Sequence, residues 1–314
     1  MFTVPASLLL LLAISPHLPD TAAGTVQRGP AGLAVAEFRV AVAPAETLAV
    51  AAAGDGLAVI LLSGPIGSVF TWRHILEAPA LAGNRLVVID PLGMGRSARP
   101  PGADYSLEAQ ARRIYAMMDS LDITSAVIVG HGVSGSIAMR LALLHPERVI
   151  ALVSVEGGPA ERAGSPGIKK ALAFAPLLKL FGGKRMIRGK IRSGLRDASG
   201  DPAWVTEEVV DRYAEGPAAD VGATLRTLGA MADARESQAL TPRLGALAVP
   251  VAFVFGGAQH AGGPSDQEMN LLHAGMSGAE FIRIEGAGHY LQEESPDAVV
   301  RTISRMSVIA RAGP

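Results

Sequence analysis

Residues 126–136 read AVIVGHGVSGS, and this stretch decides the fold. Its first four residues form an apolar run typical of a strand that is buried on both faces of a parallel sheet. Glycines follow at 130 and 132, and residues 137–144 then have helical spacing before His145 and Pro146. The pattern predicts a strand that ends in a sharp turn and leads into a helix.

The same alternation continues on both sides of this stretch. Apolar runs of strand length occupy residues 38–42, 47–52, 57–62, 85–89, 149–155, 250–255 and 280–284, and helical periodicity occupies 106–121 and 296–311. Strands that alternate with helices indicate a parallel sheet with right-handed crossovers. The sequence therefore predicts an α/β fold with a mostly parallel sheet.

Composition excludes several classes of protein. The chain has 314 residues, 49% hydrophobic and 18% charged, which is the composition of a chain with a large core and not of a disordered one. The net charge of -1 gives no basic excess for nucleic acid. Because there is no cysteine, disulfides and thiol nucleophiles are excluded. No dinucleotide, phosphate-loop or metal-ligand motif is recognised, so we predict no cofactor and no metal.

The chain divides into three predicted parts. Residues 1–28 contain the apolar run ASLLLLLAI (6–14), which has signal-peptide length but is shorter than the ~20 residues that span a bilayer. We interpret this part as a signal peptide or a disordered or membrane-tethering extension, which predicts export or membrane association; without such a role the chain is cytoplasmic. Residues 29–157 and 246–314 form the α/β core, and residues 158–245 form a helical insertion.

The insertion is basic. It holds all five lysines of the chain, with leucines and phenylalanines between some of them: Lys169, Lys170, Lys179, Lys184 and Lys190. A basic amphipathic surface can bind anionic lipid, which makes a membrane surface one candidate partner. The alternative is that the apolar residues pack on the core while the charged groups remain in water. The oligomeric state is not predicted.

Five short motifs occur in a fixed order: SGPIGS (63–68), DPLGMGRS (90–97), GHGVSG (130–135), HPERV (145–149) and GAGH (286–289). Together they strongly resemble the α/β-hydrolase superfamily, in its branch with a helical cap after the sixth strand. The resemblance covers about residues 35–310. It implies an eight-stranded, mostly parallel sheet flanked by helices, with the insertion as a cap over a pocket at the carboxyl ends of the strands.

The residues at the family's catalytic positions depart from the family pattern. Counted back from His145, the nucleophile position falls on Gly132, which has no side chain but accepts the positive φ of the turn. The acid position falls on Gln259, a neutral amide, while His289 stands at the position of the family's histidine.

The oxyanion loop also departs from the pattern. Gly64 precedes Pro65, which has no N–H, and the loss of one such donor costs ~3 kcal/mol of transition-state stabilisation. The N–H of Val133 remains in register, and we interpret His131 as a support for this loop.

Two neighbouring residues offer a rebuilt triad. Ser134 lies in a second small-x-Ser-x-small string, but its use would move the turn two residues into the helix, and the alternative is a small packing residue. Glu156 ends the fourth buried run, where some relatives carry the acid; the alternative is a strand-end carboxylate. Asp266 is a weaker candidate acid. We interpret the remaining histidines as structural or exposed: His74, His145, His260 and His273.

Three functions remain open. The first is a protein with a degraded serine triad that binds or transforms a small, largely apolar substrate by acid/base chemistry at His289. The second is an ester or lactone hydrolase that uses Ser134, His289 and Glu156. The third is a ligand-binding protein without catalysis.

Overall fold

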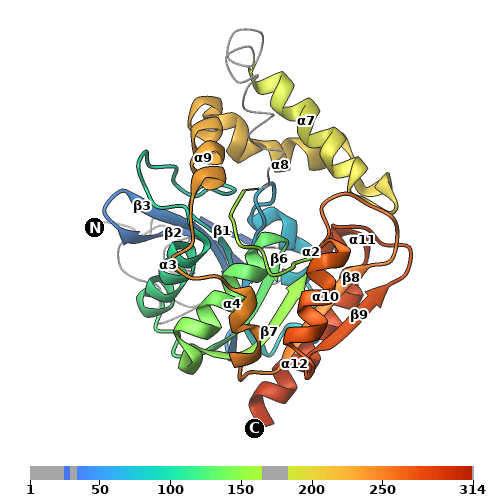
Figure 1. The fold of residues 1–314 in the computed structure, drawn as a ribbon. Coiled ribbons are helices and arrows are strands. Elements are labelled where there is room, and N and C mark those ends of the chain that lie inside the picture. Colours follow the sequence, from blue (N-terminus) through green and yellow to red (C-terminus); the bar gives the residue numbers. More distant parts are fainter. Residues whose placement is uncertain (1–24, 29–33, 165–182, 313–314) are drawn as a thin grey trace.

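The computed structural model describes residues 25–28, 34–164 and 183–312, and its centre is one twisted sheet (Figure 1). The sheet has nine strands in the order β1-β2-β3-β5-β4-β6-β7-β8-β9. The first three pairs in this order (β1–β2, β2–β3 and β3–β5) are antiparallel, and the other five pairs are parallel. The strands are β1 (Thr25–Arg28), β2 (Ala34–Ala43), β3 (Glu46–Ala53), β4 (Leu57–Leu62), β5 (Asn84–Asp90), β6 (Ala126–His131), β7 (Val149–Val155), β8 (Val251–Gly256) and β9 (Glu280–Ile284).

The predicted α/β fold is confirmed. The eight predicted strands correspond to β2–β9, and their limits agree with the observed ones to within two residues except at the start of β2, which begins four residues earlier. The short β1 is an addition: residues 25–28, at the end of the predicted N-terminal extension, pair antiparallel with β2. Residues 1–24, with the signal-like run, lie outside the described part of the chain.

Helices cover both faces of the sheet because each carries an apolar stripe toward it. One core packs α3 (Leu107–Ser120), α4 (Val133–Leu144) and α10 (Asp266–Gly275) on one face. The other packs α2 (Arg73–Leu76), α11 (Leu291–Glu294) and α12 (Pro296–Ala312) on the opposite face. Short 3-10 turns connect them at Val69–Trp72, Pro79–Leu81, Pro146–Arg148, Pro202–Trp204 and Thr241–Ala246. The predicted N-cap is present, since Ser106 accepts a hydrogen bond from the Ala109 N–H.

The helical insertion follows β7, the sixth of the eight predicted strands. Helices α7 (Gly183–Asp197), α8 (Glu207–Ala219) and α9 (Val221–Asp233) lie together at one end of the core, above the sheet in Figure 1. The small apolar core between α7 and α8 includes Tyr290, which comes from the main body of the protein. The cap limits proposed from sequence remain a prediction, and Lys169, Lys170 and Lys179 lie outside the described residues. Within the described part, no helix is both long and apolar enough to cross a bilayer.

Candidate active site

The turn between β6 and α4 has the backbone of a nucleophile elbow. Gly132 stands at its tip with φ 57° and ψ -129°, and its N–H donates to the Val155 carbonyl. The turn is tight: a Cβ at Gly130 would lie 2.4 Å from the Ser134 carbonyl oxygen, so glycine is required there. A Cβ built on Gly132 would lie 3.6 Å from His289 Nε2, an ordinary contact distance. Position 132 therefore faces the histidine with no side chain of its own.

His289 is held by one backbone and one side-chain contact. Its backbone N–H donates to the carbonyl of Ala198, just after α7, and its ring Nδ1 lies 3.4 Å from Glu156 Oε2. The side chain is 13% exposed. Because a carboxylate only accepts, the contact favours the tautomer with the proton on Nδ1. The lone pair of the neutral ring then lies on Nε2, the atom that faces position 132.

Glu156 follows β7 and carries the carboxylate of the site. Its φ of 55° is one of the positive values at non-glycine residues, a conformation that costs about 1–3 kcal/mol and is common at functional positions. Oε1 accepts the Gly256 N–H, and the side chain is 1% exposed. Burial by itself raises the pKa of Glu156, but hydrogen bonds from His289 and Gly256 outweigh it and hold the pKa below its ordinary value. The group is a buried carboxylate.

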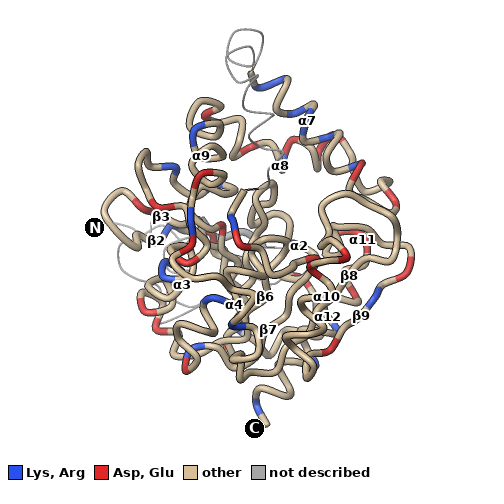
Figure 2. Tube along the Cα trace, viewed as in Figure 1, with Lys and Arg blue, Asp and Glu red and all other residues tan. Residues whose placement is uncertain are grey.

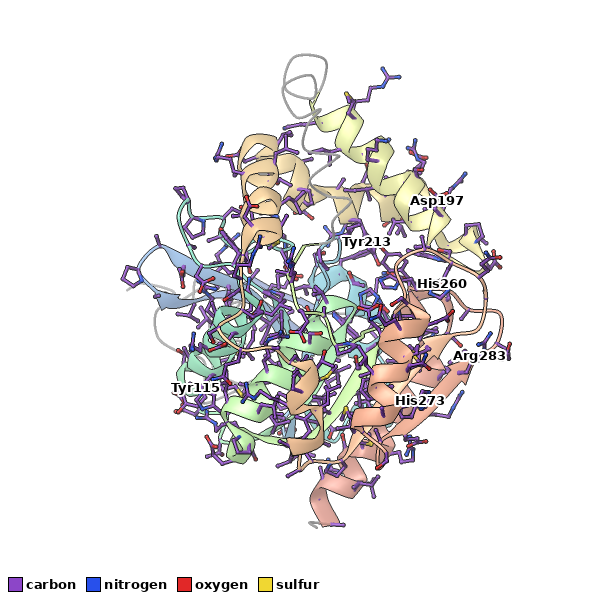
Figure 3. All side chains as sticks on the ribbon, viewed as in Figure 1. Tyr115, Asp197, Tyr213, His260, His273 and Arg283 are labelled. Atoms are coloured by element: carbon purple, nitrogen blue, oxygen red, sulfur yellow. The ribbon has the colours of Figure 1, made fainter. Side chains whose placement is uncertain are left out.

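His260 is the residue that sequence interpretation missed. It lies in the loop after β8 with its side chain 8% exposed, and its Nε2 is 2.9 Å from Glu156 Oε2. Its Nδ1 lies 2.8 Å from the Ala258 carbonyl. Figure 3 places it between the core and the cap, on the same side of the molecule as Tyr213, while His273 lies lower against the core. The sequence interpretation did not foresee this contact of His260, because it considered spacing along the chain and this pairing spans 104 residues.

The other two candidate acids do not lie at the histidine. Gln259 is exposed in the loop before His260, and Asp266 is exposed in the first turn of α10. Among the described contacts of His289, the carboxylate is that of Glu156. The structure thus brings the strand-end acid of β7 to His289, and not the residue at the position that the family pattern indicates.

Ser134 is not brought to His289. It lies in the first turn of α4, fully buried, and its hydroxyl donates to the Ser63 carbonyl at 2.7 Å. That bond fastens the helix to the loop that contains Gly64 and Pro65. The packing interpretation fits this geometry, and the interpretation of Ser134 as a nucleophile does not.

The oxyanion side of the site rests on a neutral histidine. His131 Nε2 lies 3.0 Å from the His289 carbonyl oxygen, which can only accept, so Nε2 carries the proton. Burial, with a smaller contribution from the charge of His289, lowers the pKa of His131 to about 3. Its Nδ1 faces Gly64, where a Cβ would lie 3.0 Å away. Val133 opens α4, and its N–H is among those with no partner inside the helix.

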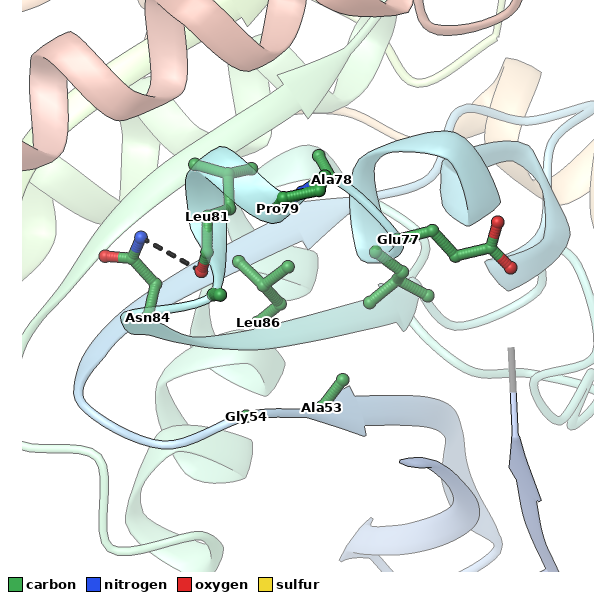
Figure 4. A pocket seen from close by; sticks show the side chains of 10 residues that line it. Ala53, Gly54, Glu77, Ala78, Pro79, Leu81, Asn84 and Leu86 are labelled. Atoms are coloured by element: carbon green, nitrogen blue, oxygen red, sulfur yellow. Dashed lines mark hydrogen bonds between the residues drawn. The ribbon is translucent and has the colours of Figure 1, made fainter. Parts of the chain in front are cut away.

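An aromatic group stands beside His289. Tyr290 packs against the His289 ring at 5.2 Å and against Trp204 at 5.4 Å, with Tyr213 6.0 Å away. The cavity drawn in Figure 4, about 180 Å³, is elsewhere. Its lining includes Ala53 and the residues Asn84 and Leu86 at the start of β5, whereas His289, Glu156 and Gly132 follow the ends of parallel strands. That cavity therefore opens at the opposite edge of the parallel sheet.

The basic surface of the cap is partly neutralised. Figure 2 shows positive residues along α7 and negative ones on α8. Arg188 pairs with Asp211 and Glu207, and Arg192 also pairs with Glu207. Lys184 and Lys190 are exposed on α7. Binding to a membrane surface stays a prediction.

Comparisons with known proteins agree with the fold. A pig protein named bifunctional epoxide hydrolase 2 is 38% identical over 103 residues, which is 32% of this chain and 19% of that protein, so the chain spans about a fifth of that relative. An uncharacterised Mycobacterium tuberculosis protein is 28% identical over 276 residues, 81% of this chain and 76% of the relative. The crystal structure of Cfl2 from Burkholderia cenocepacia superposes with a TM-score of 0.71 at 24% identity, covering 89% of this chain and 98% of that one.

The family comparison covers most of the chain. A family model described as alpha/beta hydrolase fold matches residues 58–296, a range that includes Gly132, Glu156, helices α7–α9 and His289. The chain belongs to the alpha/beta hydrolase fold family.

Proposed function

We propose that this protein acts on a small, largely apolar molecule by proton transfer at His289, with Glu156 as the group that orients the ring, and forms no covalent acyl intermediate. One observation carries the proposal. The elbow keeps its strained backbone and its aim at His289, but residue 132 offers no oxygen to attack with. A serine mechanism needs that oxygen within hydrogen-bond reach of the base.

The remaining groups suit a general base. The Glu156 contact at Nδ1 leaves the lone pair of His289 on Nε2, directed at position 132. A water or an acidic C–H of a substrate bound beside Gly132 would give its proton to this nitrogen. The neutral His131 adds no positive charge beside the ring. The Val133 N–H can donate to an oxygen that gains negative charge during the reaction.

Addition of water is the reaction to test first. The pig relative is named as an epoxide hydrolase, so small epoxides belong in the substrate panel beside esters and lactones. Tyr290 and Trp204 beside His289 suit apolar substrates. A general base contributes about 10²–10⁴-fold in rate, so His289→Ala should lower kcat by about 100-fold or more on any substrate that is turned over. Turnover that survives this substitution would contradict the role of His289.

Labelling with a fluorophosphonate separates this proposal from a serine hydrolase. The wild-type chain should remain unlabelled, because Ser134 is buried and hydrogen-bonded to Ser63. Stoichiometric labelling that is lost in Ser134→Ala would reject the proposal and restore the Ser134 interpretation. Tight binding of an apolar ligand that is unchanged in His289→Ala, with no product, would instead identify a binding protein.

Introducing a serine at position 132 tests whether His289 is placed to act as a base. The Cβ of Gly132→Ser would lie 3.6 Å from His289 Nε2, close enough for the hydroxyl to reach the ~2.6–3.2 Å range of a catalytic hydrogen bond. We expect the variant to gain fluorophosphonate labelling and a burst of p-nitrophenyl acetate hydrolysis. The matched control is Gly132→Ala, which adds the Cβ without the hydroxyl and should gain neither. A correctly folded Gly132→Ser variant that stays unreactive would show that His289 is not positioned as a base.

A further inference from the structure

When His260 is neutral, no hydrogen atom lies between its Nε2 and the carboxylate of Glu156. The Ala258 carbonyl only accepts, so Nδ1 of His260 must hold a proton to bond with it at 2.8 Å. The Nε2 of a neutral ring is then a lone pair, and it lies 2.9 Å from Glu156 Oε2, an oxygen that also accepts. Two acceptors at this distance require a proton or a cation between them: a second proton on His260, a proton on Glu156, or a metal ion.

We propose that Glu156, His260 and His289 form a binding site for a divalent transition-metal ion, with Zn²⁺ as its probe. The three side chains each offer one ligand atom, and these atoms all lie within 4.8 Å of one another. Two histidines and a carboxylate are a ligand set that proteins use for Zn²⁺ and for Fe²⁺, with the remaining positions open.

The separations of the ligand atoms suit such an ion. Ligands about 2.1 Å from a tetrahedral ion lie about 3.4 Å apart. Here Glu156 Oε2 is 2.9 Å from His260 Nε2 and 3.4 Å from His289 Nδ1. The Nδ1–H of His260 bonded to a backbone carbonyl is the outer arrangement that usually fixes a metal-ligating histidine. Small rotations of the side chains would complete the coordination.

Two glycines leave room beside the ligand atoms, and this is an independent observation. A Cβ at Gly263 would lie 2.8 Å from Glu156 Oε2 and 2.9 Å from His260 Nε2, and a Cβ at Gly262 would lie 3.4 Å from His289 Nδ1. At residues 262–263 the loop therefore passes close to all three ligand atoms with no side chain. Any side chain at 263 would enter the space where the contacts of the ion converge.

An ion at this position would change what His289 can do. Its Nδ1 would be taken by the metal, so the proton of the neutral ring would move to Nε2. His289 would then donate toward Gly132 and could not accept a proton there. The metal-bound and the metal-free chain are therefore two alternative states, and His289 is the proposed base in the metal-free one. Metal binding is measured without a substrate and turnover is measured after removal of metal, so the failure of one proposal does not decide the other.

The test is metal uptake by the full-length chain. After treatment with a chelator and its removal, the wild-type protein is titrated with Zn²⁺ by calorimetry and with Co²⁺ by visible absorption. We expect one equivalent to bind with micromolar affinity or better. His260→Ala should weaken binding by more than the about 10–100-fold that outer-shell changes cost. His145→Ala is the matched control, because His145 stacks on Tyr115 away from the cluster, and it should bind as the wild type does.

Gly263→Ala is the second variant. It keeps all three ligands, and its added methyl should weaken metal binding while circular dichroism shows an intact fold. Absence of uptake by the wild type, or uptake that is unchanged in His260→Ala, would overturn the proposal. Nitrogen-15 spectra of the metal-free chain show whether His260 carries protons on both ring nitrogens. If it does, and metal uptake is absent, the contact is an ion pair.

Discussion

Glu156 and position 259 are the two candidates for the acid that orients His289. Glu156 already contacts His289 Nδ1, whereas Gln259 is exposed in its loop. In the Gly132→Ser background, Glu156→Gln should therefore lower the gained esterase rate by at least about tenfold, because it removes the charge that stabilises an imidazolium. Gln259→Asp should change that rate by less than threefold. A large gain from Gln259→Asp, measured as kcat/KM, would show that the loop rearranges to use position 259.

Asp90, at the end of β5, is a buried carboxyl group whose contribution to the free energy of unfolding depends on pH. Burial raises its pKa from 3.8 to about 6, and the hydrogen bond from the Arg96 N–H offsets only part of this. Between about pH 4 and 6 the folded chain holds a proton that the unfolded chain has released. This contribution to stability therefore falls as pH rises, by at most about 3 kcal/mol at about 1.4 kcal/mol per unit.

Replacement of this group isolates the effect. The side chain of Asp90→Asn does not titrate, so the free energy of unfolding of this variant should increase relative to that of the wild type as the pH is raised from 4 to 6 and then level off. Urea unfolding of both proteins at several pH values measures this difference. Other titrating groups, His131 among them, are common to both chains and largely cancel. A difference that stays constant with pH would show that the pKa of Asp90 is not raised.

Helices α2, α8 and α11 meet at one buried charge. Glu293 of α11 is fully buried and receives both terminal nitrogens of Arg73 at 2.6 Å. The Tyr213 hydroxyl of α8 donates to the same carboxylate at 2.8 Å. This network ties the cap to the core beside Tyr290. Burial raises the pKa of Tyr213 well above its ordinary value, so its hydroxyl keeps the donated proton.

The hydrogen bond between Tyr213 and Glu293 should contribute to the free energy of unfolding. Tyr213→Phe removes a hydrogen bond to a buried charge and should cost about 1.5–3 kcal/mol of the free energy of unfolding. Tyr115→Phe is the control, because the contacts of Tyr115 with His145 and Arg148 are made by the ring, and it should cost much less. Both are measured by urea unfolding. Equal costs for the two variants would argue that the bond between cap and core contributes little.

The basic surface of the cap leads to a prediction about membrane binding. Its arginines Arg188 and Arg192 are paired with acids of α8, so the remaining positive charge of α7 lies on exposed residues, among them Lys184 and Lys190. Each lysine near an anionic bilayer is worth about 1 kcal/mol. If the cap docks on such a surface, Lys184→Gln with Lys190→Gln should lower vesicle binding by about 30-fold in flotation. Arg283→Gln on β9 is the control and should leave binding unchanged; an equal loss there would indicate non-specific attraction.

The order of elements was determined by the sequence alone. Apolar runs and helical periods are local patterns, and the motif GHGVSG at 130–135 marks the turn because glycine is the residue that its backbone tolerates best. The absence of a side chain at 132 is likewise a local fact. The distance to His145 was enough to place Gly132 at the elbow that the structure shows.

The pairing of side chains at the strand ends was decided by the tertiary structure. Glu156 lies 133 residues from His289 and 104 from His260, and it meets both because β7, β8 and β9, which precede the three residues, are neighbours in one parallel sheet. The positive φ of Glu156 and the glycines at 262 and 263 complete that meeting. Such contacts depend on how strand ends and loops converge in space, and no local pattern along the chain encodes that convergence.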